Sequence, residues 1–160
     1  MGMDATAILF YGYCWTDHEK LFDVEDDWQT TLLKKRGEKN PWDDYPDTTG
    51  LKWEQQQAVS TAWKVANQVA ITAWVAKSKA VDAEFGVDIG YHGSMDYALP
   101  YVYADDSRVR VDYGCCKDLT GKDLTATQLA WDEVLDRFMT ELCIEKPHPA
   151  PRWWLVAYYG

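Results

Sequence analysis

The sequence predicts an α+β fold in one domain, residues 1–160: a mixed, mostly antiparallel sheet of about five strands, packed with a long Ala/Trp-rich helix and an amphipathic C-terminal helix. Three observations lead to this prediction. Residues 51–85 form the longest run without Gly or Pro. Residues 5–15 and 153–159 are apolar at both odd and even positions, which is typical of interior strands. Residues 131–143 repeat apolar side chains with a helical period.

The first element that we expect is an interior strand from Ala5 to Trp15. Gly12 in its middle indicates a bulge, or a place where another backbone or side chain packs closely. Thr16 is a favourable N-cap, so a helix through about Leu33 can follow. Alternatively, one helix runs from about Val24 to Arg36, because acidic residues precede basic ones there, as the helix dipole favours.

Residues 37–50 contain two prolines and end in glycine, which predicts a loop. The following helix, residues 51–85, would be about 50 Å long if straight, which is more than a compact domain of this size offers. We therefore expect a break near Asn67 or around Ser78.

Two tryptophans of this long helix are predicted to be core residues. Trp63 and Trp74 lie three turns apart on one face, beside a strip of small Ala side chains that a partner surface can approach closely. Apolar residues surround the helix axis between residues 65 and 76. This pattern is typical of a helix that is covered on more than one side.

Short strands follow the long helix. Gly86 is expected to end the helix, and residues 87–91 to form a strand. Residues 97–103 and 108–114 are predicted to pair as a β-hairpin. Pro100 marks the first of these two strands as an edge strand or a bulged one.

The C-terminal helix has the clearest pattern in the chain. Its predicted apolar face consists of Trp131, Val134, Leu135, Phe138, Met139, Leu142 and Cys143. Its predicted solvent face carries Asp132, Glu133, Asp136 and Glu141. A proline-rich linker then leads to the interior strand of residues 153–159.

Composition excludes several classes of function. The chain has 26 acidic and 16 basic residues and a net charge of −10, which opposes direct binding to nucleic acid or to anionic lipid. No apolar run reaches the length of a membrane span, and no signal peptide precedes the first strand, so we expect a cytoplasmic protein. Cys115 and Cys116 are adjacent and no CxxC spacing occurs, so we expect free thiols, no metal and no cofactor.

One stretch offers a candidate enzymatic or ligand-binding site. A glycine-flanked turn at residues 90–94 holds His92 and Ser94, and Asp88 or Asp96 is a possible partner for the histidine. Cys115 and Cys116 are the other candidates for chemistry at this site. The alternative interpretation is a turn histidine with satisfied hydrogen bonds and thiols that pack as small hydrophobic groups.

Two stretches place carboxylates next to large aromatic rings. The first holds Asp26, Asp27 and Trp28, and the second holds Trp42, Asp43, Asp44, Tyr45 and Asp47. Aromatic side chains are favoured at protein interfaces, and carboxylates can occupy a partner's phosphate-binding groove. These eight residues are therefore the candidate partner-binding site. A solvated acidic face is the alternative.

In size, acidity, Trp content and the phrases EDDW, WDDYPD and WWLVAYYG, the chain resembles small accessory proteins of bacteriophages, among them anti-CRISPR and other anti-defence inhibitors. The resemblance implies a non-enzymatic protein that blocks a basic, nucleic-acid-binding surface of a host complex. Two other hypotheses remain open: a small enzyme or ligand-binding protein with a site near His92, and an assembly protein that forms a homodimer through its Ala-rich helix.

Overall fold

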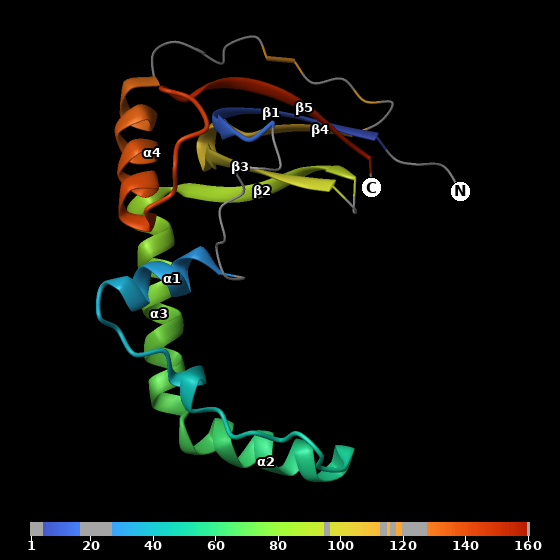
Figure 1. Ribbon diagram of the computed structural model, residues 1–160, viewed down its shortest axis with the longest axis vertical. Helices are drawn as coiled ribbons and strands as arrows, with labels where there is room; N and C mark the ends of the chain where they lie inside the picture. Colours follow the sequence, from blue (N-terminus) through green and yellow to red (C-terminus); the bar gives the residue numbers. More distant parts are fainter. Residues whose placement is uncertain are drawn as a thin grey trace. The chain divides into compact units, whose positions relative to one another are not determined.

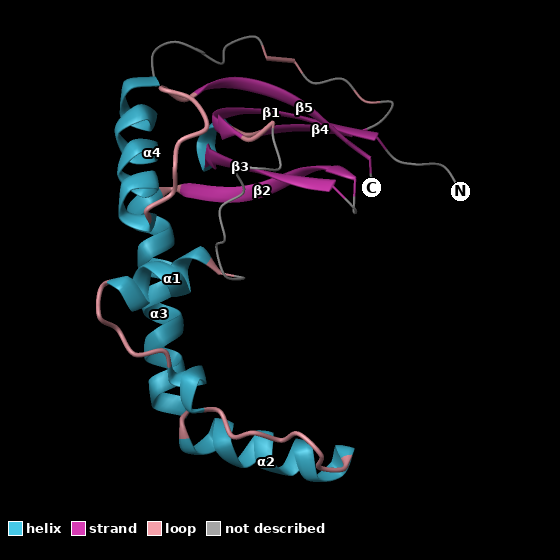
Figure 2. Ribbon diagram, viewed as in Figure 1, coloured by secondary structure: helices cyan, strands magenta, loops and turns pink. Residues whose placement is uncertain are grey.

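The computed structural model describes residues 5–16, 27–94, 97–112, 115, 118–119 and 128–159. Within them the fold is α+β, with helices and a five-stranded, mostly antiparallel sheet, as the sequence predicts (Figures 1 and 2). The chain divides into two compact units, residues 1–23 with 85–160, and residues 24–84. We call them the sheet unit and the helical unit.

The sheet unit contains β1 (Ala5–Cys14), β2 (Val87–Ser94), β3 (Tyr97–Ala104), β4 (Val109–Asp112), α4 (Gln128–Leu142) and β5 (Arg152–Tyr159). The helical unit contains α1 (Trp28–Lys35), α2 (Trp53–Ala66) and α3 (Gln68–Phe85), except that Phe85 itself is counted in the sheet unit.

β1 is an interior strand, as predicted, and has three partner strands (Figure 1). One edge pairs with β5 from Ala5 to Gly12. The other edge pairs first with β4, from Thr6 to Leu9, and then with β3, from Gly12 to Cys14. β3 also pairs along its whole length with β2, and β2 meets β5 in one parallel pairing. The pairings of β1, β3, β2 and β5 therefore form a closed circuit.

The predicted hairpin of residues 97–103 and 108–114 is wrong, because β3 pairs with β2 and β4 pairs with β1. A short 3-10 turn, Asp105–Ser107, redirects the chain between β3 and β4. The buried Ser107 hydroxyl accepts a hydrogen bond from the Tyr11 backbone N–H at 2.9 Å and donates to the Ala104 carbonyl at 2.6 Å. Ser107 thus accepts the hydrogen bond of a β1 backbone N–H at the point where the strand beside β1 changes from β4 to β3.

The close approach predicted at Gly12 is confirmed. A Cβ atom added there would lie 1.9 Å from the backbone oxygen of Val102 on β3. Only glycine lets β3 approach β1 this closely.

One face of the sheet carries a core built on aromatic rings. Phe10 stacks on Tyr101 with 4.3 Å between ring centroids, and Tyr103 lies 6.0 Å from Phe10. This cluster consists of Ile8, Phe10, Cys14, Tyr101, Tyr103 and Val156, with Trp154 half-buried against it.

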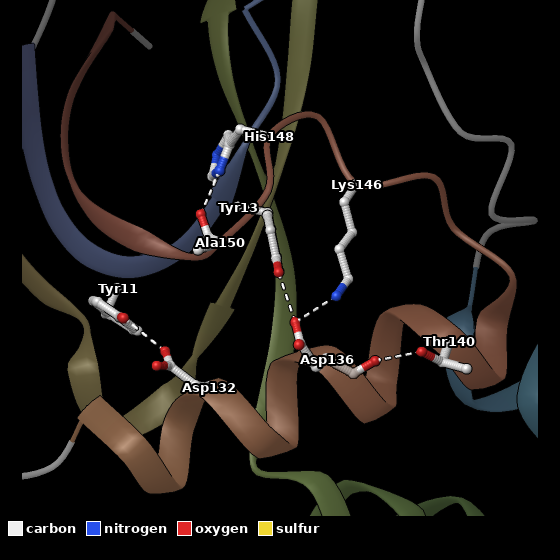
Figure 3. Close-up of polar contacts among 8 residues, drawn as sticks. All are labelled: Tyr11, Tyr13, Asp132, Asp136, Thr140, Lys146, His148 and Ala150. Carbon is white, nitrogen blue, oxygen red and sulfur yellow. Dashed lines mark hydrogen bonds and ion pairs between the residues drawn. The ribbon is translucent and has the colours of Figure 1, made fainter.

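Helix α4 is attached to β1 by a pair of Tyr–Asp hydrogen bonds (Figure 3). The Tyr11 hydroxyl donates to Asp132 at 2.6 Å, and the Tyr13 hydroxyl donates to Asp136 at 2.7 Å. Asp132 and Asp136 were predicted on the solvent face, and that prediction is wrong because both carboxylates accept from β1. The spacings match, since residues two apart on a strand and four apart on a helix are each separated by about 6 to 7 Å.

The apolar face of α4 is otherwise as predicted up to its last residue. Leu135, Phe138, Met139 and Leu142 are buried, whereas Trp131 and Val134 are only half-buried. Cys143 is exposed and adopts a left-handed φ of 58°, so the helix ends one residue earlier than predicted. The backbone N–H of Cys143 bonds to Thr140 and that of Ile144 to Met139, which is the Schellman pattern of a helix C-terminus.

In the helical unit, α1 begins close to the later of the two predicted starts. Asp27 is its N-cap, and the carboxylate accepts from the Gln29 backbone N–H at 3.1 Å. Residues 17–26, where the earlier start was predicted, lie outside the described part of the chain.

The predicted break at Asn67 is confirmed, because α2 ends at Ala66 and α3 begins at Gln68. Trp74 is buried, as predicted, but Trp63 is only half-buried, so its assignment to the core is wrong. Val65 and Val69 are 72% and 85% exposed. The expectation of a helix covered on more than one side is therefore also wrong, and in the described structure no residue of α2 is buried.

Candidate functional site

The most prominent surface feature of the helical unit is an aromatic cluster, which we define as Trp42, Tyr45 and Trp63. The centroid of the Trp63 ring lies 5.0 Å from that of Trp42 and 5.1 Å from that of Tyr45. The indole N–H of Trp63 donates to the Asp44 backbone carbonyl at 3.2 Å. The rings pack directly against one another, so the cluster presents their outer faces and edges to its surroundings.

Local sequence builds this cluster into a rigid turn. The side chain of buried Asn40 accepts from the Trp42 backbone N–H at 3.0 Å and so caps a short 3-10 helix, Pro41–Asp44. Pro41 supplies the fixed φ that suits the first position of this helix. The following loop is tied to α2 by Gln56, whose side-chain amide donates to the Leu51 carbonyl at 3.0 Å.

Large apolar side chains remain exposed on and beside this turn. Trp42 is 41% exposed, and Trp53, the first residue of α2, is 70% exposed. Val65 is also exposed on this helix, but it follows Trp63 by two residues, about 200° around the helix axis, so it lies on a different face from the aromatic cluster. Exposed aromatic side chains are the usual mark of a surface that another molecule covers.

The carboxylates of the candidate partner-binding site have partners within the helical unit. Asp43 lies 3.2 Å from Lys34, and Asp44 lies 2.6 Å from Lys39. These ion pairs are exposed, so water screens them and they contribute little to stability. Asp47 accepts from the Thr49 backbone N–H, and hydrogen bonds from the Thr49 hydroxyl and backbone lower the pKa of this carboxyl.

The first predicted stretch does not form one surface with exposed rings. Asp26 lies outside the described residues, and the Asp27 carboxylate caps α1. Trp28 is buried, contrary to the expectation of an exposed ring, so its side chain takes no part in a partner-binding surface. It is buried because it begins an amphipathic helix whose buried positions also include Leu32 and Leu33.

Charge is distributed unevenly between the two units. By sequence, residues 24–84 carry ten acidic and eight basic residues, whereas the sheet unit carries sixteen acidic and eight basic residues. Most of the net charge of −10 therefore belongs to the sheet unit. Within residues 41–66 four carboxylates stand against two lysines, but Asp43 and Asp44 are also paired with Lys34 and Lys39 from outside this segment, so the charges around the aromatic cluster balance.

The alternative site around His92 has a different geometry from the one predicted. His92 lies within β2 and not in a turn. Its Nε2 atom lies 3.1 Å from the Trp15 backbone oxygen and 3.3 Å from Cys14 Sγ. Because a carbonyl oxygen only accepts, Nε2 carries the hydrogen and donates to Trp15. In this tautomer Nε2 has no lone pair with which to take a proton from Cys14.

The Cys14 thiol is also poorly suited to act as a nucleophile. It is only 2% exposed, and burial raises its pKa to about 11, although Arg152 acts in the opposite direction. A reactive cysteine needs a lowered pKa and access to solvent. The contact between Cys14 and His92 is therefore a packing contact.

The other residues of that alternative site are not brought together by the described structure. Cys115 is an exposed free thiol. Asp96, Cys116 and the side chain of Ser94 lie outside the described residues. Among the residues that are described, no group of three or more His, Cys, Asp or Glu side chains is placed to hold a metal ion.

Sequence reasoning did not single out Trp53, and it placed Trp63 in the core. The sequence of α2, WEQQQAVSTAWKVA, contains no Leu, Ile, Met or Phe. A helix with so few large aliphatic side chains cannot fill a broad apolar stripe, so its tryptophans remain at the surface. The lack of large aliphatic residues in α2 was therefore the sequence feature that could have predicted exposed tryptophans.

Comparison with protein-family models, with curated proteins and with solved structures finds no match for this chain. Among the described helices, none is both long and apolar enough to cross a membrane.

Proposed function

We propose that this chain is a protein-binding protein and that its partner covers the aromatic cluster together with Trp53. The observation that supports the proposal is the exposure of large apolar side chains along a 14-residue helix, α2, in which no residue is buried. Tryptophan and tyrosine are the residues most enriched at the energetic centre of interfaces.

The cluster is also suitably rigid for binding. Trp42 is held by Asn40 and Pro41 from the N-terminal side, and Trp63 is held by its hydrogen bond to the Asp44 carbonyl. Rings that are already ordered lose little conformational entropy when a partner covers them. We therefore expect little rearrangement of this turn on binding.

We further propose that the partner presents a basic rim. The chain as a whole carries −10, and the Asp43 and Asp44 carboxylates beside the cluster are held only by exposed ion pairs to Lys34 and Lys39, which a basic partner can replace. Carboxylates at a rim accelerate encounter with a basic surface. Inhibition of a host nucleic-acid-binding complex, which the resemblance to phage proteins implies, stays a prediction.

Affinity capture with matched variants tests the proposal. Wild type, Trp42→Ala, Trp53→Ala and Leu155→Ala are immobilised and exposed to a bacterial lysate, and bound proteins are identified by mass spectrometry. Leu155 is the control, because it is 73% exposed and apolar but belongs to the sheet unit. Circular dichroism first establishes that each variant is folded.

We expect a partner that wild type and Leu155→Ala retain and that both Trp variants lose. A partner that both Trp variants retain but Leu155→Ala loses would contradict the proposed surface. The homodimer hypothesis gives a third pattern: wild type would sediment as a dimer on analytical ultracentrifugation, and Trp53→Ala would shift it to monomer.

A further inference from the structure

The sheet unit has a hollow of about 300 Å³ that the proposed function does not use. Strands β1, β2 and β3 and the start of β4 line it. The side chains that matter for recognition are Tyr101, Tyr103, Arg108 and Arg110, together with Asp88. A volume of 300 Å³ lies at the small end of ligand-binding pockets, which suits a molecule with a single ring.

The floor of the hollow is formed by two tyrosine rings whose planes are inclined to each other by 38°. Tyr101 and Tyr103 are each 2% exposed, with 5.4 Å between their ring centroids. The Tyr101 ring lies against the backbone of Gly90, where an added Cβ atom would be only 2.3 Å from the ring. Glycine at this position therefore leaves the space that the ring occupies.

Arg108 is held over this floor by a chain of hydrogen bonds. Its guanidinium donates to the Tyr103 hydroxyl at 3.1 Å, and that hydroxyl donates to Asp88 at 3.2 Å. The guanidinium carbon also lies 5.4 Å from the centroid of the Tyr103 ring. A guanidinium has five N–H donors, so this contact leaves donors on Arg108 for a ligand.

Arg110 adds a second cation beside the first. Its Nε–H donates to Asp112 at 2.9 Å, which leaves its two terminal amino groups for a ligand. Arg110 also forms an ion pair with Asp112, so the two guanidinium groups stand against two carboxylates, Asp88 and Asp112, and the local charge is about zero. The hollow therefore differs from the rest of its unit, which has sixteen acidic and eight basic residues, in that no net negative charge opposes an anion there.

From this geometry we propose that the hollow binds a small planar-ring molecule that carries an oxyanion. Arginine matches the geometry of carboxylates and phosphates through paired N–H donors, so Arg108 and Arg110 bind the anionic group. Tyr101 and Tyr103 form the surface against which the ring of the ligand packs. The Asp88 carboxylate is engaged by the Tyr103 hydroxyl and the Ile89 backbone N–H, which reduces its repulsion of the anion.

Isothermal titration calorimetry with phenyl phosphate as the probe tests this site. Benzoate, benzyl alcohol and inorganic phosphate supply the separate parts: the ring with a carboxylate, the ring without a charge, and the anion without a ring. We expect phenyl phosphate or benzoate to bind at least about tenfold more tightly than benzyl alcohol and than inorganic phosphate, because both parts contribute. Whichever of the two binds more tightly identifies the natural anion as phosphate or carboxylate.

Variants then locate the binding. Arg110→Gln and Arg108→Gln are expected to weaken binding of the tighter probe at least about tenfold. Arg152→Gln is the control, because it makes the same charge change at an exposed arginine of the sheet unit that does not line the hollow. Arg110 is exposed, so its substitution leaves the fold intact.

Two outcomes overturn the proposal. One is a failure of both ring-bearing anions to bind more tightly than benzyl alcohol, which would show that the arginines do not recognise an oxyanion. The other is an equal loss for Arg152→Gln and Arg110→Gln, which would show a general effect of charge. Neither outcome affects the proposed protein-binding surface, which belongs to the helical unit.

Discussion

Single residues set the geometry at the points where strands and helices change partner or end. Ser107 supplies a hydroxyl to the Tyr11 backbone where the neighbour of β1 changes. Gly12 permits the approach of β3, and Cys143 turns the chain at the end of α4. Each of these functions depends on the chemistry of one side chain, or on its absence, so each can be tested by one substitution.

Substitution of Gly12 by Ala should destabilise the protein by about 2 to 3 kcal/mol. The added methyl group would meet a backbone oxygen at 1.9 Å, and a paired backbone cannot move aside as a flexible side chain can. Urea denaturation measures the loss. Gly37→Ala is the comparison, because Gly37 has a φ of 84° and no atom near its Cβ position, so only backbone strain of about 1 kcal/mol is expected. Equal losses at the two positions would contradict the crowding argument.

Substitution of Cys143 by Gly should stabilise the protein by up to about 1 kcal/mol. Cys143 has a φ of 58° in the Schellman turn, a conformation that costs a residue with a Cβ more than it costs glycine. Its side chain is exposed, so no packing is lost. Thermal unfolding of wild type, Cys143→Gly and Cys143→Ala separates loss of the thiol from relief of backbone strain. A melting temperature for the Gly variant no higher than that of the Ala variant would contradict this assignment.

At the scale of elements, α4 and β1 are joined by polar contacts as well as by apolar packing. Burial alone would raise the pKa of Asp136, but hydrogen bonds from Lys146 and Tyr13 outweigh it and hold the pKa below the ordinary 3.8. Burial and Asp136 raise the pKa of Tyr13, so its hydroxyl stays protonated and continues to donate. The Lys146 ammonium lies 2.7 Å from the same carboxylate oxygen (Figure 3).

This arrangement predicts a pH dependence of stability. A carboxyl whose pKa is lower in the folded state stabilises the protein above its ordinary pKa of 3.8, and that contribution is lost as pH falls through the folded-state value. We therefore expect Asp136→Asn to be less stable than wild type at pH 7, by about 1 kcal/mol because the carboxylate is half-exposed, and the difference to shrink between pH 4 and pH 2. Urea denaturation across this range measures it. A difference that stays constant with pH would indicate a packing effect instead.

Truncation of Trp74 and truncation of Trp63 should cost different amounts of stability. Trp74 is 7% exposed, so truncation to Ala is expected to cost about 3 to 5 kcal/mol. Trp63 is half-buried at the surface cluster, so Trp63→Ala should cost less than Trp74→Ala, about 1 to 2 kcal/mol. Chemical denaturation of both variants decides this. Equal losses would restore the original prediction that both rings are core residues.

Periodicity predicted the elements well and their partners poorly. The strands at both ends of the chain, the break at Asn67 and the apolar face of α4 follow from local pattern, because each depends on side chains close in sequence. The chain passes from β3 to β4, the partner of β1, through a turn that contains Ser107, and nothing in the neighbouring sequence indicates the hydrogen bond that Ser107 makes with β1. The acidic residues of α4 were wrongly assigned to the solvent face, because tyrosines of β1 donate hydrogen bonds to two of them. The local sequence pattern of α4 cannot indicate a contact with a strand so distant in the sequence.

In the candidate sites, too, local features could be predicted from the sequence and long-range contacts could not. Trp42, Tyr45 and the neighbouring carboxylates were identified from local composition, and the structure places the two rings in one cluster. The addition of Trp63 could not be predicted, because it comes from a helix eighteen residues further on. The hollow with Arg108 and Arg110 was likewise missed, because the residues that line it come from strands that are separate in the sequence.

At the scale of the whole molecule, the units differ in charge as well as in architecture. The sheet unit has an excess of eight acidic residues and the helical unit an excess of two. A net charge of −10 acts over about one Debye length, roughly 8 to 10 Å at physiological salt, so it influences the rate at which a charged partner arrives more than the strength with which it is held.

If a basic partner covers the aromatic cluster, local charge should matter more than net charge. Asp43→Lys with Asp44→Lys changes the net charge from −10 to −6 and replaces the ion pairs to Lys34 and Lys39 with like-charge contacts. Association should then slow by about two- to tenfold at low salt and lose part of its salt dependence. Trp42→Ala should instead speed dissociation, by about tenfold or more if the ring is an energetic centre of the interface.

Surface plasmon resonance with the captured partner at two salt concentrations separates these effects. Asp105→Lys with Asp106→Lys is the matched control, because it makes the same charge change at two exposed residues of the sheet unit. If only the net charge steers the encounter, both double variants slow association equally. If the partner's rim lies opposite residues 43 and 44, the first slows it more. Unchanged kinetics for Trp42→Ala and for the Asp43/Asp44 variant alike would remove the aromatic cluster as the binding surface, because a ring at the centre of an interface cannot be truncated without a faster dissociation.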